Sequence, residues 1–316
     1  MDVADLRMFE AVARLGSMNQ AARELHTVQS NVTTHIQALE HELGVELFYR
    51  NRRGVTLTPA GHRMLPFVTR LQKLIADARM AVRDEGEPNG TLLLGSLETT
   101  MALRLGPAMT RFARDYPAVA MVVQTGTTQK VIEQVVAGKI DGGFVAGPVS
   151  HPDLDQEKVF REELVLVTPR SIRSITDLAG KPELRTIVFQ IGCSYRQRLE
   201  AVLAGLGITT AKPLEFGSLD AILGCVSGGV GVTLLPKGLV AGAQRQGRVS
   251  VHELPPEQAQ VETLFVRRRD GYPSSALKTF LKMARALYDP AKRIGSFNGS
   301  QTESIPVASP RRASVR

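Results

Sequence analysis

The chain has 316 residues, of which 43% are hydrophobic and 22% charged, and its formal net charge is +8. This length allows two or three domains, and the composition is typical of a globular protein. No apolar run approaches the roughly 18 residues of a membrane span, the N-terminus lacks the features of a secretory signal, and two cysteines do not make a disulfide framework. We therefore expect a cytoplasmic protein with no membrane partner.

Three amphipathic helices are predicted at the N-terminus. Leu6, Phe9 and Val12 share one face of the first helix. Residues 17–27 and 28–44 supply the next two, because apolar side chains recur there at helical spacing. These side chains are Ala21, Ala22, Leu25, Val32, Ile36, Leu39 and Leu43. Two successive helices of this kind, each with one buried stripe, are typical of a helix-turn-helix.

The opposite face of the third helix is polar and uncharged. It carries Gln29, Ser30, Asn31, Thr33, Thr34 and His35. Short donors and acceptors of this kind can bind base edges in the major groove, and Gln29 is the best candidate for a bidentate contact with adenine. His35 lies at the flank, where we expect a phosphate contact or none.

Acidic residues are missing from two windows that would face DNA. None occurs from Leu25 to Leu39 or from Leu47 to Ala76. A phosphate-binding surface must exclude carboxylates as well as supply cations, because each carboxylate repels the backbone. The net charge is a weaker argument, since residues 1–90 contain 11 basic and 11 acidic side chains.

The second window contains a predicted two-stranded wing that turns at Gly54. Its arginines, Arg50, Arg52 and Arg53, would contact the DNA backbone or the minor groove. A structural alternative for Arg50 is an ion pair with Glu46.

A long linker helix follows the wing. Thr58 is suited to the N-cap and Pro59 to the first helical position, and the helix should run to about residue 83. Pro66 is expected to kink it or to delay its regular part. Apolar residues repeat with spacing 4-3-4-3-4, which predicts a coiled-coil seam and therefore a homodimer. The seam comprises Met64, Val68, Leu71, Ile75, Ala78 and Val82.

Residues 84–90 form a polar hinge rich in Gly and Pro, beyond which strand and helix patterns alternate. This alternation predicts a mainly parallel sheet covered by helices, an α/β fold. The predicted strands cover residues 91–97, 118–125, 143–146, 164–168, 186–190, 230–235 and 261–267. Residues 289–316 have no periodicity and are predicted to be a disordered tail.

At fixed spacing, these residues resemble the LysR-type transcriptional regulators over nearly the whole chain to about residue 288. The resemblance is carried by Phe9, Gly16-Ser17, Ala21-Ala22, Leu25, Gln29-Ser30, Val32, Ile36, Leu39-Glu40, Leu43-Gly44, Leu47-Phe48, Arg50, Leu57-Thr58, Ala60-Gly61, Phe112, Tyr116-Pro117, residues 138–141 and residues 229–236. Two positions depart from the family pattern: Thr33, where serine is commoner, and Val28, which could alter the start of the recognition helix.

The resemblance implies a winged helix-turn-helix at 1–58, a linker helix and hinge at 59–90, and an effector-binding domain at 91–288 like a periplasmic binding protein. Its lobes would be residues 91–161 with 266–288, and residues 162–265. The implied function is sequence-specific regulation of transcription by a homodimer or homotetramer on a spaced, near-palindromic operator. RNA polymerase would be a partner if the protein activates. No cofactor is implied beyond a small-molecule effector, bound between the lobes.

The effector would sit where helices begin beyond the carboxyl ends of strands. Hydroxyls and free backbone N–H groups there suit a carboxylate, so an anionic metabolite is the predicted ligand. The candidate residues are Thr99, Thr100, Thr127, Thr128, Gly192, Cys193, Ser194, Arg196 and Ser218. A preceding acid, Glu98, would oppose an anion or pair with an amine, and the threonines could instead cap their helices.

Two alternatives remain open on the sequence, and a third, an enzyme, is not expected. Cys193 lies at a predicted helix N-terminus, which lowers a thiol pKa, so the regulator could be a redox sensor. A nonspecific architectural DNA-binding protein is a second alternative, although it would not need an α/β domain. An enzyme is the third, but we find no catalytic residues, no phosphate-binding loop and no histidine spacing typical of a metal site.

Overall fold

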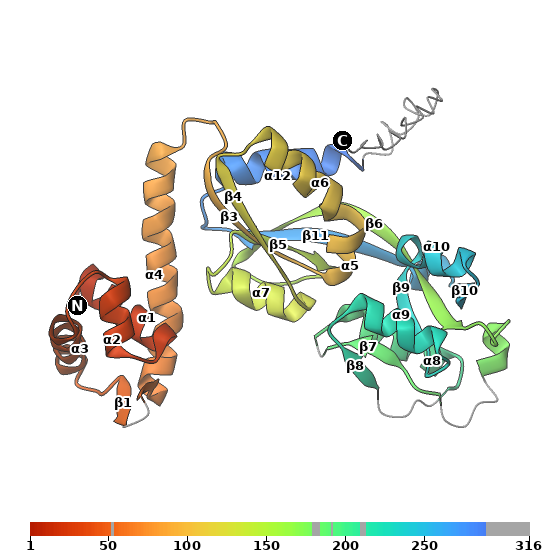
Figure 1. Ribbon diagram of the computed structural model, residues 1–316, viewed down its shortest axis with the longest axis horizontal. Coiled ribbons are helices and arrows are strands. Elements are labelled where there is room, and N and C mark those ends of the chain that lie inside the picture. The colour runs from red at the N-terminus through yellow and green to blue at the C-terminus, as the bar shows by residue number, and fades with distance from the viewer. Residues whose placement is uncertain (52–53, 179–183, 191, 209–212, 289–316) are drawn as a thin grey trace, which may run out of the picture.

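The computed structural model describes residues 1–51, 54–178, 184–190, 192–208 and 213–288. A small helical domain at the N-terminus is joined by one long helix to a larger domain with two lobes (Figure 1). The predicted residues Arg52 and Arg53 and the predicted tail at 289–316 lie outside the described residues.

The N-terminal domain contains α1 (Val3–Leu15), α2 (Met18–Glu24) and α3 (Gln29–Leu43). Their apolar stripes meet in one core, in which Phe9, Ile36 and Leu39 are fully buried. Side chains that accept backbone N–H groups begin α1 at Asp2 and α2 at Ser17. Gly44, with a φ of 68°, ends α3 in the left-handed conformation that glycine adopts without strain.

The wing is an antiparallel pair, β1 (Phe48–Asn51) and β2 (Gly54–Leu57). The wing packs against the end of α1, because Val55 donates its N–H to the carbonyl of Gly16 at 3.0 Å. Thr58 then caps α4 (Pro59–Arg83), as predicted. The helix is continuous on both sides of Pro66.

The apolar residues of α4 serve two different cores. Met64 and Val68 pack into the N-terminal domain, so the first part of the predicted seam is wrong. The apolar side chains that stay exposed on α4 are Phe67, Leu71, Leu74 and Val82. Val68 packs into the N-terminal domain because α1, α2 and α3 alone leave one side of their small core uncovered, and the start of α4 covers it.

Lobe I is built on three parallel strands in the order β5 (Gly142–Ala146), β3 (Gly90–Ser96), β4 (Val119–Thr125). After β3 the chain forms one helical run made of α5 (Glu98–Thr100), a π-helical turn η1 (Met101–Leu105) and α6 (Gly106–Asp115). The helix α7 (Thr128–Val136) follows β4, and α12 (Ser275–Ala286) returns to this lobe at the end (Figure 1).

The two lobes share the long strand β6 (Leu154–Pro169). Its first half pairs with β11 (Gln260–Arg268), and its second half pairs with β9 (Thr233–Pro236) and β10 (Val249–Glu253). All of these pairings are antiparallel, and so is that of β11 with β5. The predicted mainly parallel sheet is therefore wrong for the main sheet, which is mixed, because β11, β9 and β10 run against β6 and the parallel strands of lobe I.

Strand pairing also bears on where the chain changes lobes. β11 pairs with the first half of β6 along its whole length and with β5 of lobe I from Thr263 to Val266, on the N-terminal side of the predicted boundary at 266. The first half of β6 was not predicted as a strand. Buried and exposed residues alternate between Leu154 and Glu163, and the exposed ones are mostly charged, so no apolar run marks it.

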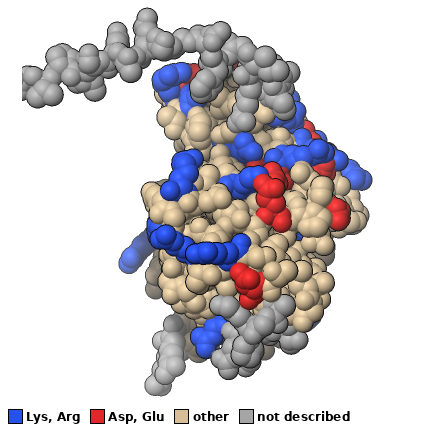
Figure 2. Space-filling view, turned by 90° about the vertical axis from the view of Figure 1, so that its right-hand side faces the viewer, with Lys and Arg blue, Asp and Glu red and all other residues tan. Residues whose placement is uncertain are grey.

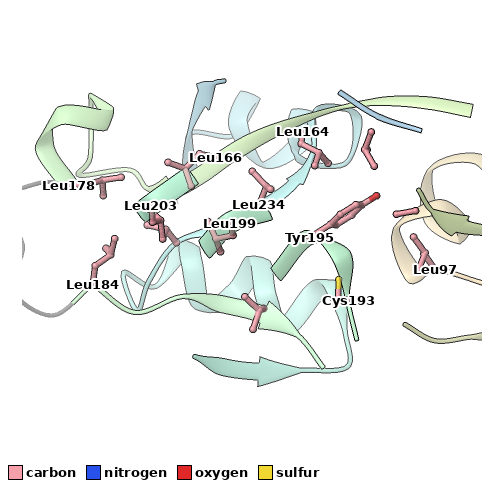
Figure 3. Close-up of a cluster of buried hydrophobic side chains, with 14 of the residues drawn as sticks. Leu97, Leu164, Leu166, Leu178, Leu184, Cys193, Tyr195, Leu199, Leu203 and Leu234 are labelled. Atoms are coloured by element: carbon pink, nitrogen blue, oxygen red, sulfur yellow. The ribbon is translucent and has the colours of Figure 1, made fainter. Parts of the chain in front are cut away.

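Lobe II contains the parallel pair β7 (Ile187–Phe189) and β8 (Leu214–Phe216), covered by α8 (Ser194–Gly205), α9 (Leu219–Ser227) and α10 (Lys237–Arg245). Two short helical segments, η2 (Ile175–Leu178) and α11 (Pro256–Ala259), complete it. Figure 3 shows its core, in which Tyr195 on α8 extends its hydroxyl toward Leu97 of lobe I.

Candidate functional sites

The polar face of α3 is presented to solvent at the outer edge of the N-terminal domain (Figure 1). Gln29, Ser30 and Thr34 are exposed, whereas Asn31 and Thr33 are half-buried. The Thr33 and Thr34 hydroxyls donate to the carbonyls of Gln29 and Ser30, at 2.9 and 3.0 Å. Their oxygens keep free lone pairs, so both threonines can still accept hydrogen bonds from a partner.

The start of α3 is uncapped by any side chain. Its N-cap residue is Val28, which is 64% exposed and forms no side-chain hydrogen bond with the first turn. The backbone N–H groups of Gln29 and Ser30 therefore have no partner within the helix. The departure from the family pattern at Val28 leaves an open, electropositive helix end, which suits a phosphate oxygen.

His35 faces α1 rather than the open surface. Its Nδ1 lies 2.7 Å from Oδ1 of Asp5, whose other oxygen accepts the N–H of Asp2. Burial raises the pKa of Asp5, but the hydrogen bonds from His35 and Asp2 outweigh it and hold that pKa below its ordinary value. Only Nε2 is left for a phosphate contact. Asp2, Asp5 and His35 also form the one group with metal-ligand spacing in the described residues, and these contacts already occupy it.

Arg50 is tied to α3. Its guanidinium donates to Glu40 at 2.9 Å, and the same carboxylate accepts the backbone N–H groups of Leu47 and Phe48. The expected alternative pairing with Glu46 is wrong, because Glu40 is the acid that reaches the start of the wing. With 41% of its side chain exposed, Arg50 holds the wing in place and remains accessible.

A cleft of about 100 Å³ lies between the lobes where the predicted effector site was expected. Thr99, Thr127 and Cys193 are among its lining residues. Glu98, the acid expected to oppose an anion or pair with an amine, also lines the cleft. The lining residues that were not predicted are Leu97, Thr125, Gly126, Lys130, Phe189, Gln190, Tyr195, Phe216 and Gly217. The aromatic residues were not predicted because β8 is short and only folding brings it beside β7.

The other predicted cleft residues lie behind the lining. Thr100 is buried, and the Thr128 hydroxyl accepts the N–H of Ala146 at 3.4 Å. Ser218 is the N-cap of α9 without a side-chain bond. Gly192 closes the cleft from lobe II, because its carbonyl accepts the N–H of Gln129 at 3.5 Å and a Cβ there would meet the Thr127 hydroxyl at 2.9 Å.

Arg196 does not supply the cation for a bound anion. Its guanidinium donates to Glu200 at 3.1 Å and to Glu215 at 2.6 Å, and it is absent from the cleft lining. The structure therefore does not support the prediction that Arg196 binds the effector, because two carboxylates already hold its guanidinium. Lys130, in the first turn of α7, is the cation that lines the cleft.

Buried hydroxyl groups without hydrogen-bond partners gather at this cleft. Within the described part of the chain, five buried side-chain polar atoms have none, and Thr99 Oγ1, Ser194 Oγ and Tyr195 OH are three of them. Burial raises the pKa of Tyr195 to about 12, and the nearby Thr99 hydroxyl opposes that shift without completing a hydrogen bond. Such groups normally find a partner, so their concentration here points to a ligand.

Cys193 lacks the features of a reactive thiol. It is 9% exposed, and burial raises its pKa although the N–H groups of Tyr195 and Arg196 act in the opposite direction. The lowered pKa expected at a helix N-terminus is therefore not found, because desolvation dominates. Cys225 packs in a different cluster of lobe II.

The linker helix is fastened to lobe I by charged side chains. Lys73 bridges Asp77 of its own helix and Asp141, at 2.9 and 2.5 Å, and Arg70 bonds Asp270 at 2.8 Å. Burial lowers the pKa of Lys73, but the two carboxylates outweigh it, so the pKa is raised. Because these contacts reach strand ends of lobe I, a shift in that lobe would move α4.

The basic excess of the chain lies outside residues 1–90: residues 91–288 contribute +5 and residues 289–316 contribute +3. Figure 2 shows the face turned away from the N-terminal domain, where Lys and Arg outnumber Asp and Glu. None of the described helices is long and apolar enough to cross a membrane. The local surface of α3, rather than net charge, therefore marks the candidate DNA contact.

Comparison with known proteins agrees with this architecture. The family described as "LysR substrate binding domain" matches residues 85–289, and "Bacterial regulatory helix-turn-helix protein, lysR family" matches residues 3–62. The chain is 40% identical over 285 residues to the HTH-type transcriptional regulator GltR of Bacillus subtilis, covering 90% of this chain and 96% of GltR. It is 40% identical over 287 residues to YofA of Bacillus velezensis, covering 91% and 99%.

Solved structures share the fold. A full-length variant of OxyR from Pseudomonas aeruginosa superposes with a TM-score of 0.69 at 20% identity, covering 90% of this chain and 95% of OxyR. CbnR in complex with its target DNA gives 0.63 at 24% identity, covering 90% and 99%. The chain therefore belongs to the LysR family of transcriptional regulators and combines a DNA-binding helix-turn-helix with an effector-binding domain.

Proposed function

We propose that this regulator binds a spaced, near-palindromic operator as a homodimer, or as a homotetramer of two dimers. The observation that carries the proposal is the exposed apolar row on α4. Phe67, Leu71 and Leu74 are 69%, 43% and 52% exposed, and they follow one another at coiled-coil spacing. A second copy of the same helix would cover this row and give the protein two DNA-binding domains in a fixed relation.

In this proposal α3 enters the major groove of each half-site. Gln29 and Ser30 at its first turn, with Thr34 one turn further, contact base edges, while Asn31 and Thr33 contact bases or nearby phosphates. The uncapped N-terminus of α3 and the accessible Arg50 hold the backbone. The protein would act in the cytoplasm, where its DNA is, and would contact RNA polymerase if it activates transcription.

The cleft between the lobes holds the effector. Support comes from the buried, unpartnered hydroxyls of Thr99 and Tyr195, and from Lys130 and the N-terminus of α7, which favour a negatively charged group. The ligand would change the angle between the lobes, and the Lys73 contacts would transmit that change to α4. Redox control through Cys193 has less support, since its thiol is buried and its pKa is raised.

The first test is a footprint of the purified protein on the DNA upstream of its own gene, over a salt series. We expect two protected half-sites that survive moderate salt. Uniform, salt-labile protection would instead favour a nonspecific architectural protein. Leu74→Glu should convert the dimer to a monomer in sedimentation analysis and abolish protection of the paired half-sites. An exposed glutamine of α11 provides the control Gln258→Ala, which should change neither.

A further inference from the structure

The charges that line the effector cleft are one acid and one base, and neither is neutralised by a neighbour. Glu98 and Lys130 both line the cleft, and neither side chain forms an ion pair or hydrogen bond with any described residue. Neighbouring charges behave differently. Arg196 is held by two glutamates, and the half-buried Arg104 is held by both oxygens of the buried Glu162 at 2.6 and 2.8 Å.

A ligand with a single charge would satisfy only one of the two. A dicarboxylate bound by Lys130 would leave the carboxylate of Glu98 beside a like charge. A simple amine bound by Glu98 would leave the ammonium group of Lys130 beside the positive charge of the amine. Like charges brought together in a partly dehydrated site cost binding energy and are a common means of rejecting a wrong ligand. A ligand with both charges avoids each penalty.

The remaining lining residues fit the rest of such a ligand. Lys130 follows the cap residue Thr127 at the start of α7, where the N–H groups favour a carboxylate. Glu98 precedes Thr99, whose unpartnered hydroxyl and that of Tyr195 can accept hydrogen bonds from an ammonium group. Leu97, Phe189 and Phe216 form an apolar wall, and no second cation lines the cleft among the described residues.

We propose that the effector is an α-amino acid with an apolar side chain, its carboxylate directed to Lys130 and its ammonium group to Glu98. This assignment rests on the proposed role of the cleft as the effector site. The assignment replaces the predicted simple anion by a zwitterion. It excludes a charged side chain on the ligand, since the described lining residues offer one cation and one acid, and the ligand's two end groups already use both. The buried hydroxyls of Thr99 and Tyr195 lie near Glu98 and would accept hydrogen bonds from the ammonium group of the ligand.

Calorimetric titration of the full-length protein tests this. The probes are L-alanine, L-valine, L-leucine, L-methionine and L-phenylalanine. For each amino acid that binds, its α-keto acid and its decarboxylated amine are titrated as analogues that lack one charge. We expect at least one amino acid to bind, and each analogue to bind about 10- to 100-fold more weakly, as for the loss of a charged hydrogen bond.

Two substitutions separate the contributions. Glu98→Gln should weaken amino-acid binding at least about tenfold and strengthen binding of the keto acid, whereas Lys130→Gln should weaken both. Lys139→Gln and Glu257→Gln alter exposed charges outside the cleft lining and should change neither affinity. Circular dichroism verifies that each variant is folded.

Two outcomes would overturn the assignment in distinguishable ways. If a keto acid or succinate binds as tightly as any amino acid, and Lys130→Gln abolishes that binding, the cleft is an effector site for a plain anion and only the zwitterion is wrong. If amino acids, carboxylates and amines all fail to bind, the role of the cleft proposed above fails together with it.

Discussion

The polar face of α3 and the cleft between the lobes are proposed to bind different partners, and they are built in opposite ways. On α3 the hydroxyls of Thr33 and Thr34 already donate to their own helix, and the outward side chains are hydrated. In the cleft the hydroxyls of Thr99 and Tyr195 are buried without partners. Polar groups on an exposed surface are hydrated when no DNA is bound, so leaving them without a protein partner costs little free energy. Buried hydroxyls without partners do carry such a cost, and a ligand that hydrogen-bonds to them removes it.

The largest effect is expected from a substitution at Gly192, where the two lobes meet beside the cleft. Gly192 has a φ of 92°, and a Cβ there would meet the Thr127 hydroxyl at 2.9 Å. Gly192→Ala should therefore cost about 1–3 kcal/mol locally, spread the lobes and abolish the effector response. Calorimetric titration and thermal unfolding measure this. Gly205→Ala, at a site where a Cβ would contact nothing within 4 Å, is the control. Equal behaviour of the two variants would refute the closure role of Gly192.

On the exposed face of α3, shortening a side chain should change the preference for one DNA sequence over another and leave the folding of the protein unchanged. Gln29→Ala should remove about 1–3 kcal/mol of discrimination at one base pair per half-site, with an unchanged melting temperature. Binding to operators that vary singly at each position, measured by fluorescence anisotropy, identifies that base pair. If discrimination is unchanged at every position of the operator, Gln29 does not contact a base.

Matched substitutions test the difference between buried and exposed hydroxyls directly. Thr99→Val replaces an unpartnered buried hydroxyl by a methyl group, and the ligand-free protein should gain up to about 1 kcal/mol of stability while effector affinity falls. Thr34→Val on α3 should leave the free energy of unfolding unchanged within about 0.5 kcal/mol. Denaturant titrations compare the two. Destabilisation by Thr99→Val would mean that its hydroxyl has a partner.

The smallest expected effect is on the pH dependence of the stability of lobe II. Burial lowers the pKa of His252 from 6.5, and its Nε2 lies 2.9 Å from the Thr168 hydroxyl. The unfolded chain then binds more protons than the folded one near pH 6.5, so this contribution to stability is present above that pH and is lost on acidification. His252→Gln should flatten that part of the stability profile in thermal unfolding, whereas His62→Gln, an exposed position on α4, should not.

The fold could be predicted from the sequence where local patterns decide it. The helices of the N-terminal domain were predicted from apolar spacing, because the buried residues recur at helical intervals within each segment, as Val32, Ile36 and Leu39 do in α3. The antiparallel course of β6 was not predictable in this way. Its first half is mostly charged and polar, with no apolar run or alternation in the sequence, and only the neighbouring β11, about 100 residues later, makes it a strand.

For the sites, the sequence by itself determined the exposed polar face of α3 that is proposed to contact DNA, since Gln29, Ser30 and Thr34 lie on consecutive turns of one helix. Only the tertiary structure decided the cleft. It assigned Arg196 to two glutamates, directed His35 to Asp5, and brought Lys130, Tyr195 and Phe216 to one place from three separate segments. Helical periodicity fixes which side chains share a face, but ion pairing and contacts between lobes depend on how distant segments pack.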